Sequence, residues 1–109
     1  MNNKVNINPL SVNKAFKGRR FKTDEYKRYE KDVLDNLPAL KIPKGRLFVI
    51  INFGFSSKLK DIDNPVKLFI DILQKRYNFN DRDIFKLNVQ KEIVKKGKEY
   101  IKFEIKSIK

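Results

Sequence analysis

The chain has 109 residues, 26 of them Lys or Arg against 13 Asp or Glu, which gives a net charge of +13. It contains no Cys and no His, so disulfides, thiol nucleophiles, Cys/His zinc sites and Ser-His-Asp triads are excluded. The length suits a single domain over residues 1–109. Any catalysis must use Asp, Glu, Lys, Arg or Tyr, and carboxylates that hold a hard cation are the most natural choice.

The charge imbalance indicates a polyanionic partner, because it costs self-repulsion in the compact state. Nucleic acid is the first candidate and an anionic membrane surface the second. A membrane-surface protein is the weaker hypothesis, since no basic amphipathic helix is evident. The longest apolar run, 47–51, is far too short to span a bilayer. The N-terminus lacks the apolar segment of a signal peptide, so we expect a cytoplasmic protein.

The first predicted element is a short edge strand at 5–7, where apolar and polar residues alternate before Pro9. Residues 14–22 mix basic side chains with Phe16 and Phe21, and we expect a loop or flexible ribbon there. Such a mixture suits nucleic acid, since charges meet phosphates while rings stack on or wedge between bases. The alternative is a solvated turn whose two Phe side chains pack on the core.

A first helix is predicted from Thr23, a good N-cap, to the residues before Pro38. Residues 46–55 follow as a strand, and their continuous apolar centre predicts a central strand covered on both faces. Gly54 is expected to mark a bend or bulge near its end. In the first helix, before Pro38, the apolar side chains recur at helical spacing: Tyr26, Tyr29, Val33, Leu34 and Leu37.

A second helix is predicted to begin with Asn64 as the cap and Pro65 at the first helical position, and to end near Tyr77. Its apolar residues extend well past one face, which predicts cover on two sides. Either the sheet and the first helix provide that cover or a second subunit does. The polar side contains Lys67 and Asp71, spaced for an ion pair at i, i+4.

The last third of the chain predicts two strands, 84–94 and 100–105, joined by a hairpin turn at 95–98. The complete pattern is β-α-β-α-β-β. It predicts a small α/β or α+β domain with a mixed β-sheet and two helices. Three side chains of the first of these strands are expected to share a face: Phe85, Leu87 and Val89.

Acidic residues gather on both sides of the second helix, although the chain is so basic. Asp61 and Asp63 precede the helix, and Asp81 and Asp83 follow it. In extended backbone, residues i and i+2 point to the same side. The four groups would converge if both connections lay at one end of the sheet. Spacing alone leaves two interpretations open, cation ligands or caps of free helix N–H groups.

Three blocks of sequence span nearly the whole chain: Asn8 to Lys14 with Gly18-Arg19-Arg20 and 23–33, Asp61 to Lys67 with 71–73, and Asn80 to Ile84 with Lys91. In residues and order, these blocks resemble RusA-type Holliday junction resolvases, including those of phages and prophages. The family often has two adjacent Asp residues in the third block, where this chain has Asn80 first. The resemblance therefore maps the essential acid to Asp81, or to Asp83 if the loop aligns differently.

The resemblance implies a homodimeric endonuclease that depends on Mg²⁺, with Mn²⁺ as an alternative. It would resolve four-way DNA junctions in recombination and repair by paired symmetric nicks. It implies Asp61, Asp63 and Asp81 as metal-binding catalytic acids and Lys67 as a catalytic base or charge stabiliser. Asp71 would hold Lys67 in place or serve as a further acid. For a phage-encoded protein, the location would be the host cytoplasm, at the nucleoid.

Contacts to branched DNA are expected from the basic segment near the N-terminus, with Phe16 or Phe21 as a wedge at the crossover. The competing hypothesis is a non-catalytic nucleic-acid-binding protein of the same fold, whose acids only cap a helix. The residues expected to contact DNA are Asn13, Lys14, Lys17, Arg19 and Arg20.

Overall fold

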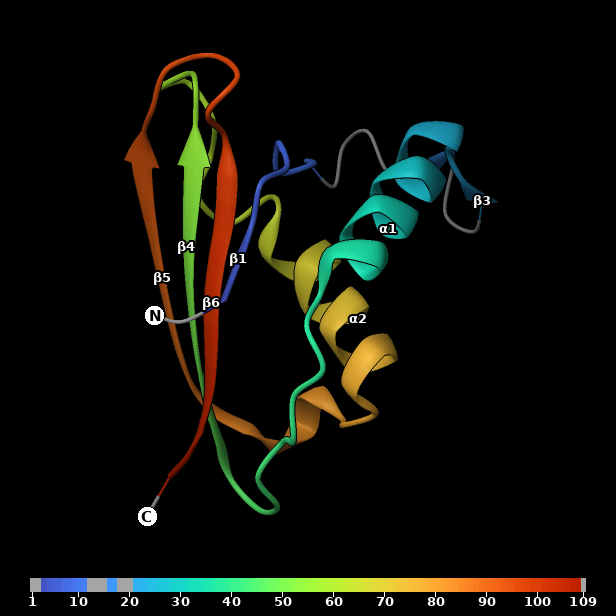
Figure 1. Ribbon diagram of the computed structural model, residues 1–109, viewed down its shortest axis with the longest axis vertical. Coiled ribbons are helices and arrows are strands. Elements are labelled where there is room, and N and C mark those ends of the chain that lie inside the picture. The colour runs from blue at the N-terminus through green and yellow to red at the C-terminus, as the bar shows by residue number, and fades with distance from the viewer. Residues whose placement is uncertain (1–2, 12–15, 18–20, 109) are drawn as a thin grey trace.

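Two helices cover one face of a four-stranded mixed sheet in the computed structural model, which describes residues 3–11, 16–17 and 21–108 (Figure 1). This α+β architecture confirms the predicted class. The order of the main helices and strands along the chain matches the expected one. A small two-stranded ribbon and a 3-10 helix are present in addition. The elements are β1 (Asn3–Val5), β2 (Phe16–Lys17), β3 (Phe21–Lys22), α1 (Asp24–Asn36), β4 (Leu47–Phe55), α2 (Val66–Tyr77), η2 (Asp81–Asp83), β5 (Ile84–Ile93) and β6 (Tyr100–Ser107).

The predicted hairpin between the last two strands is wrong, because β4 separates them in the sheet order β1-β6-β4-β5. β4 pairs in parallel with β5 and antiparallel with β6. A turn does form, with the Lys98 N–H donating to the Lys95 carbonyl at 2.9 Å. The helical crossover through α2 explains the difference. It makes β4 and β5 parallel neighbours and leaves the other side of β4 for β6.

The helices cover only one face of β4, so the prediction of a strand covered on both faces is also wrong (Figure 1). Phe53 represents the covered face and meets the Phe69 ring of α2 edge to face, with ring centroids 6.4 Å apart. On the opposite face Phe48 is only half-buried, and Lys86 Nζ lies 4.7 Å from the centre of its ring. A lysine stem and its charge can thus shield an aromatic ring without a second layer.

Gly54 is a point of close approach and not the predicted bulge. The register runs regularly through Gly54, which pairs with Glu92 on one side and Tyr100 on the other. The Tyr100 ring lies over Gly54 so closely that a Cβ there would overlap it. Its hydroxyl then donates to Glu92 Oε2 at 2.7 Å. Glycine is needed here because the ring crosses the strand where a side chain would otherwise stand.

α1 begins as predicted, with Thr23 Oγ1 accepting a hydrogen bond from the Tyr26 N–H at 3.1 Å. α2 is apolar on two sides, and both sides are covered within the chain, by the sheet and by α1 (Figure 1). That cover satisfies the first of the two predicted alternatives and requires no second subunit. Neither helix of the described chain is long and apolar enough to cross a membrane. The buried residues of α2 are Leu68, Phe69, Ile70, Ile72 and Leu73.

Glu30 of α1 joins three elements through two ion pairs. Its carboxylate lies 3.1 Å from Lys22 Nζ at the end of β3 and 3.2 Å from Lys75 Nζ near the end of α2. The Glu30 side chain is only 15% exposed. Burial alone would raise its pKa, but the hydrogen bonds and charges of the two lysines lower the pKa below the ordinary value. This carboxylate therefore holds the base of the β2–β3 ribbon against both helices.

Candidate active site

An open cleft of about 710 Å³ lies between α2 and the first half of β5. Apolar side chains form most of its wall, including Phe85, Leu87 and Val89, which were predicted to share a face. Four polar residues from the predicted motifs line the same cleft: Asp63, Lys67, Asp71 and Asp81. The structure thus brings the second and third sequence blocks to one surface.

The acids approach this cleft from opposite ends of α2 and not from one shared edge. β4 and β5 are parallel, so the chain leaves the end of β4 through Asp61 and Asp63 and returns along α2 to the start of β5, beside Asp81. A helix of 12 residues is roughly 18 Å long. Within the described ranges, no three acidic side chains lie close enough to hold one metal ion together.

The loop before α2 separates its two acids. Asp61 is exposed, and its Oδ2 accepts a hydrogen bond from Asn64 Nδ2 at 3.2 Å. It lines a smaller hollow of about 210 Å³ on the other side of the loop. Asp63 is exposed at the mouth of the main cleft. Lys91 Nζ donates to the Lys60 carbonyl at 2.9 Å, which ties this loop to β5.

None of these acids caps α2, and Asn64 is not the cap that the sequence predicted. Pro65 occupies the N-cap position, and no side chain supplies a capping hydrogen bond there. The Val66 N–H instead donates to the main-chain carbonyl of Asp63 at 3.1 Å. Asn64 is unavailable because its side-chain amide is turned toward Asp61. Capping of α2 therefore does not explain the pair of aspartates.

Asp81 is likewise free of a capping role. Asn80 is the N-cap of η2, with its Oδ1 accepting from the Arg82 N–H at 3.0 Å. Asp81 is exposed and lines the cleft. Asp83 is half-buried and lies outside the cleft lining, with its N–H donating to the Asn80 carbonyl at 2.9 Å. Of the two alternatives for the third block, only Asp81 shares a surface with Asp63.

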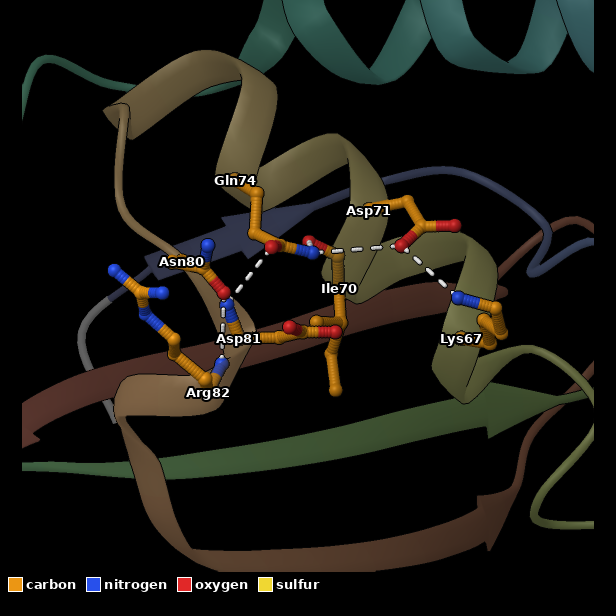
Figure 2. Close-up of polar contacts among 7 residues, drawn as sticks. All are labelled: Lys67, Ile70, Asp71, Gln74, Asn80, Asp81 and Arg82. Carbon is orange, nitrogen blue, oxygen red and sulfur yellow. Dashed lines mark hydrogen bonds and ion pairs between the residues drawn. The ribbon is translucent and has the colours of Figure 1, made fainter.

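Along α2 a chain of polar contacts connects the two ends of the cleft (Figure 2). Lys67 Nζ lies 3.4 Å from Asp71 Oδ1, as the i, i+4 spacing predicted. Gln74 Nε2 lies 3.4 Å from the same oxygen, and Gln74 Oε1 accepts from the Asp81 N–H at 2.8 Å. Sequence reasoning missed this role of Gln74. The available signal was its place three positions after Asp71, on the polar side of the helix.

The basic residues expected to contact DNA fall largely outside the described residues. Asn13, Lys14, Arg19 and Arg20 are not described, and for Lys17 the structure describes only its place in β2. Their role stays a prediction. Lys67 of α2 brings a basic side chain to the cleft, whereas Lys86 borders the cleft from β5 with its ammonium group over the Phe48 ring on the opposite face of the sheet.

The chemistry of the donors suits a hard divalent cation, although no three of the described acids converge on one point in this structure. Carboxylate oxygens are the ligands that Mg²⁺ prefers, and Mg²⁺ commonly needs only one or two carboxylates while waters and substrate phosphates complete its shell. Asp63 and Asp81 present exposed carboxylates to an open cleft that could admit a phosphate. Comparison with models of protein families and with curated proteins found no match to this chain.

Proposed function

We propose that the protein is a metal-dependent endonuclease that resolves four-way DNA junctions by paired nicks, in recombination and repair, in the cytoplasm. One observation carries the proposal. Acidic residues that serve no capping role line a single cleft beside a lysine, in a chain of net charge +13. Carboxylates and a cation around an open cleft suit phosphodiester hydrolysis without histidine.

Asp63 and Asp81 are the proposed metal ligands within the cleft, with Asp61 as a further ligand from the adjoining hollow. Bound Mg²⁺ would supply an acidified water and neutralise charge on the scissile phosphate. Lys67 projects into the same cleft, and its side chain is 73% exposed. Its contact with Asp71 directs the ammonium group along α2, where it can stabilise the oxyanion that develops on the phosphate.

The charge of the whole chain supports binding of branched DNA. Lys and Arg contacts to phosphates release counterions, so the affinity should be largely independent of sequence and should fall steeply with salt. A four-way junction presents phosphates on four arms, and a protein with a large excess of positive charge can neutralise many of them at once.

A second candidate function is a non-catalytic protein that binds branched DNA. It is favoured by the separation of Asp61, Asp63 and Asp81, which do not form a single three-carboxylate group in this conformation. In that case the cleft acids would shape the electrostatics of binding without any cleavage.

Incubation with a synthetic four-way junction separates the two functions. With Mg²⁺ or Mn²⁺ we expect two symmetric nicks, and with EDTA we expect binding without cleavage. A linear duplex of the same sequence serves as the control substrate and should remain largely intact. Tight junction binding without cleavage in either metal would reject the endonuclease and support the second candidate.

Paired nicks require two active sites, and we propose a homodimer formed through β5. The apolar faces of α2 do not support a dimer interface on that helix, since the sheet and α1 of the same chain cover them. β5 is a sheet edge, and Phe85 is 63% exposed on it, with Ile93 50% exposed. Light scattering should give a dimer mass for the parent and a monomer mass for Phe85→Lys. Leu59→Lys, at a loop position that is 85% exposed, should leave the dimer intact. A monomeric parent at micromolar concentration would contradict the proposal.

A further inference from the structure

Gln74 uses both ends of its side-chain amide to bridge α2 and η2 (Figure 2). Its Oε1 accepts from the Asp81 N–H at 2.8 Å. Its Nε2 lies 3.4 Å from Asp71 Oδ1 and 3.4 Å from the Ile70 carbonyl. The partners fix the orientation of the amide, because the reverse orientation would place a donor against an N–H and an oxygen against a carboxylate.

The segment that carries Asp81 is anchored on either side of it by Phe79 and Ile84, which pack against the core. α2 ends at Tyr77, its C-cap Asn78 has a left-handed φ of 56°, and the chain then runs through Asn80 into η2. Asn80 and Asp81 are both exposed. Among the described residues, Gln74 supplies the one side-chain hydrogen bond that joins α2 to the main chain of Asp81. Between those two anchors, this amide is the contact that ties the main chain of Asp81 to α2.

The other end of the amide acts on the opposite half of the cleft. Asp71 Oδ1 receives both Gln74 Nε2 and Lys67 Nζ, so the orientation of this carboxylate depends on two donors. We propose that Gln74 is a positioning residue that fixes Asp81 relative to the Lys67–Asp71 pair. This inference rests on the proposed function, since it assigns Gln74 to the same metal-dependent site.

Two substitutions separate the two ends of the amide. Gln74→Ala removes both contacts. Gln74→Glu keeps an acceptor for the Asp81 N–H but turns a second carboxylate toward Asp71. Loss of a partner that orients a metal ligand typically reduces metal affinity or activity by 10- to 100-fold. We expect about a tenfold loss of Mn²⁺ affinity and of the single-turnover cleavage rate for Gln74→Ala, with junction affinity unchanged within about twofold.

A double variant that exchanges the acid and the amide between positions 71 and 74 provides the rescue. In the double variant Asp71→Asn/Gln74→Glu, the new Asn amide can donate to the new Glu, so the contact is restored with donor and acceptor exchanged. Gln74→Glu should therefore reduce cleavage less in the Asp71→Asn background than in the parent. Mn²⁺ affinity is measured without DNA by electron paramagnetic resonance, and the Asp81 amide resonance by NMR should shift in Gln74→Ala. Asn36→Ala removes an exposed side-chain amide of α1 that donates to the Asp32 carbonyl, away from both the cleft and β5; it is the matched control and should change none of these.

The outcomes distinguish this inference from the proposed function. If the parent neither binds Mn²⁺ nor cleaves the junction, the proposed function fails and Gln74 has no site to position. If the parent does both and Gln74→Ala equals it in Mn²⁺ affinity and rate, the inference about Gln74 alone is overturned. If Gln74 only stabilises the fold, Gln74→Ala should lower the melting temperature and leave Mn²⁺ affinity and the cleavage rate at their parental values. Gln74→Glu should then have the same effect on cleavage in the parent and in the Asp71→Asn background. That result also overturns the inference.

Discussion

The carboxylate of Glu30 and those of Asp63 and Asp81 are used in opposite ways. Glu30 is largely buried and forms ion pairs with Lys22 and Lys75. Asp63 and Asp81 are exposed, and neither forms an ion pair with any described residue, although the chain has 26 Lys and Arg. Cations are abundant enough to pair every acid. An acid left without one at the wall of a cleft is available for a ligand, whereas Glu30 is committed to holding the fold.

The largest expected effect is on cleavage by Asp63→Asn. The amide keeps the shape of the side chain but removes a charged ligand, so the cleavage rate should fall by at least about 100-fold, measured in single turnover on the four-way junction. The free energy of unfolding, from urea denaturation, should stay within about 0.5 kcal/mol of the parent because the side chain is exposed.

Asp35→Asn is the matched control for that variant. Asp35 is an exposed acid of α1 that pairs with Lys31 at 2.9 Å and does not line the cleft. It makes the same change of net charge, so it separates loss of a ligand from a general effect of charge on DNA binding. Cleavage by Asp35→Asn should equal that of the parent. If Asp63→Asn also cleaves at the parental rate, the assignment of the site is wrong.

In contrast to Asp63→Asn, Glu30→Gln should lower the stability of the fold. The lysine side chains are 39% and 58% exposed, so solvent screens both ion pairs, and their loss should lower the free energy of unfolding by about 1 kcal/mol at pH 7. The lowered pKa of Glu30 sets the sign of the pH dependence. Its stabilisation is fully present above the unfolded pKa of about 4.3 and is lost as the pH falls through the folded value.

Urea denaturation of the parent and Glu30→Gln at pH 7 and at about pH 3 measures this difference. The two curves should converge as the pH falls and the parental carboxyl takes up its proton. A gap of constant size across that range would mean that packing and not charge makes the contribution of Glu30.

Local sequence signals predicted the secondary structure well because the determinants are local. Thr23 caps α1 through a contact three residues away, and the apolar spacing of 66–77 requires a buried helix. The pairing of strands was not predictable in the same way. The turn at 95–98 locally favours a hairpin between β5 and β6. The crossover through α2 is what places β4 between these two strands.

The candidate site was predictable as a set of residues and not as a geometry. The resemblance of the three sequence blocks selected Asp61, Asp63, Lys67 and Asp81, and all of these except Asp61 line one cleft. The spacing could not show that Asp61 turns to the other side of its loop, or that Gln74 reaches the main chain of Asp81. Both depend on where the ends of α2 lie relative to β5, which is a property of the assembled layers.

The pairing of β1 with β6 has a consequence for how the chain folds. Asn3 pairs with Phe103, so the edge strand of the sheet joins residues 100 positions apart. Closure of so long a segment has an entropic cost that must be met before the contacts form, and such non-local pairings slow folding. During synthesis the first strand has no partner until the last has emerged. The cleft is lined by residues 62–89 at the other edge of the sheet, so its walls do not wait for the pairing of β1 with β6.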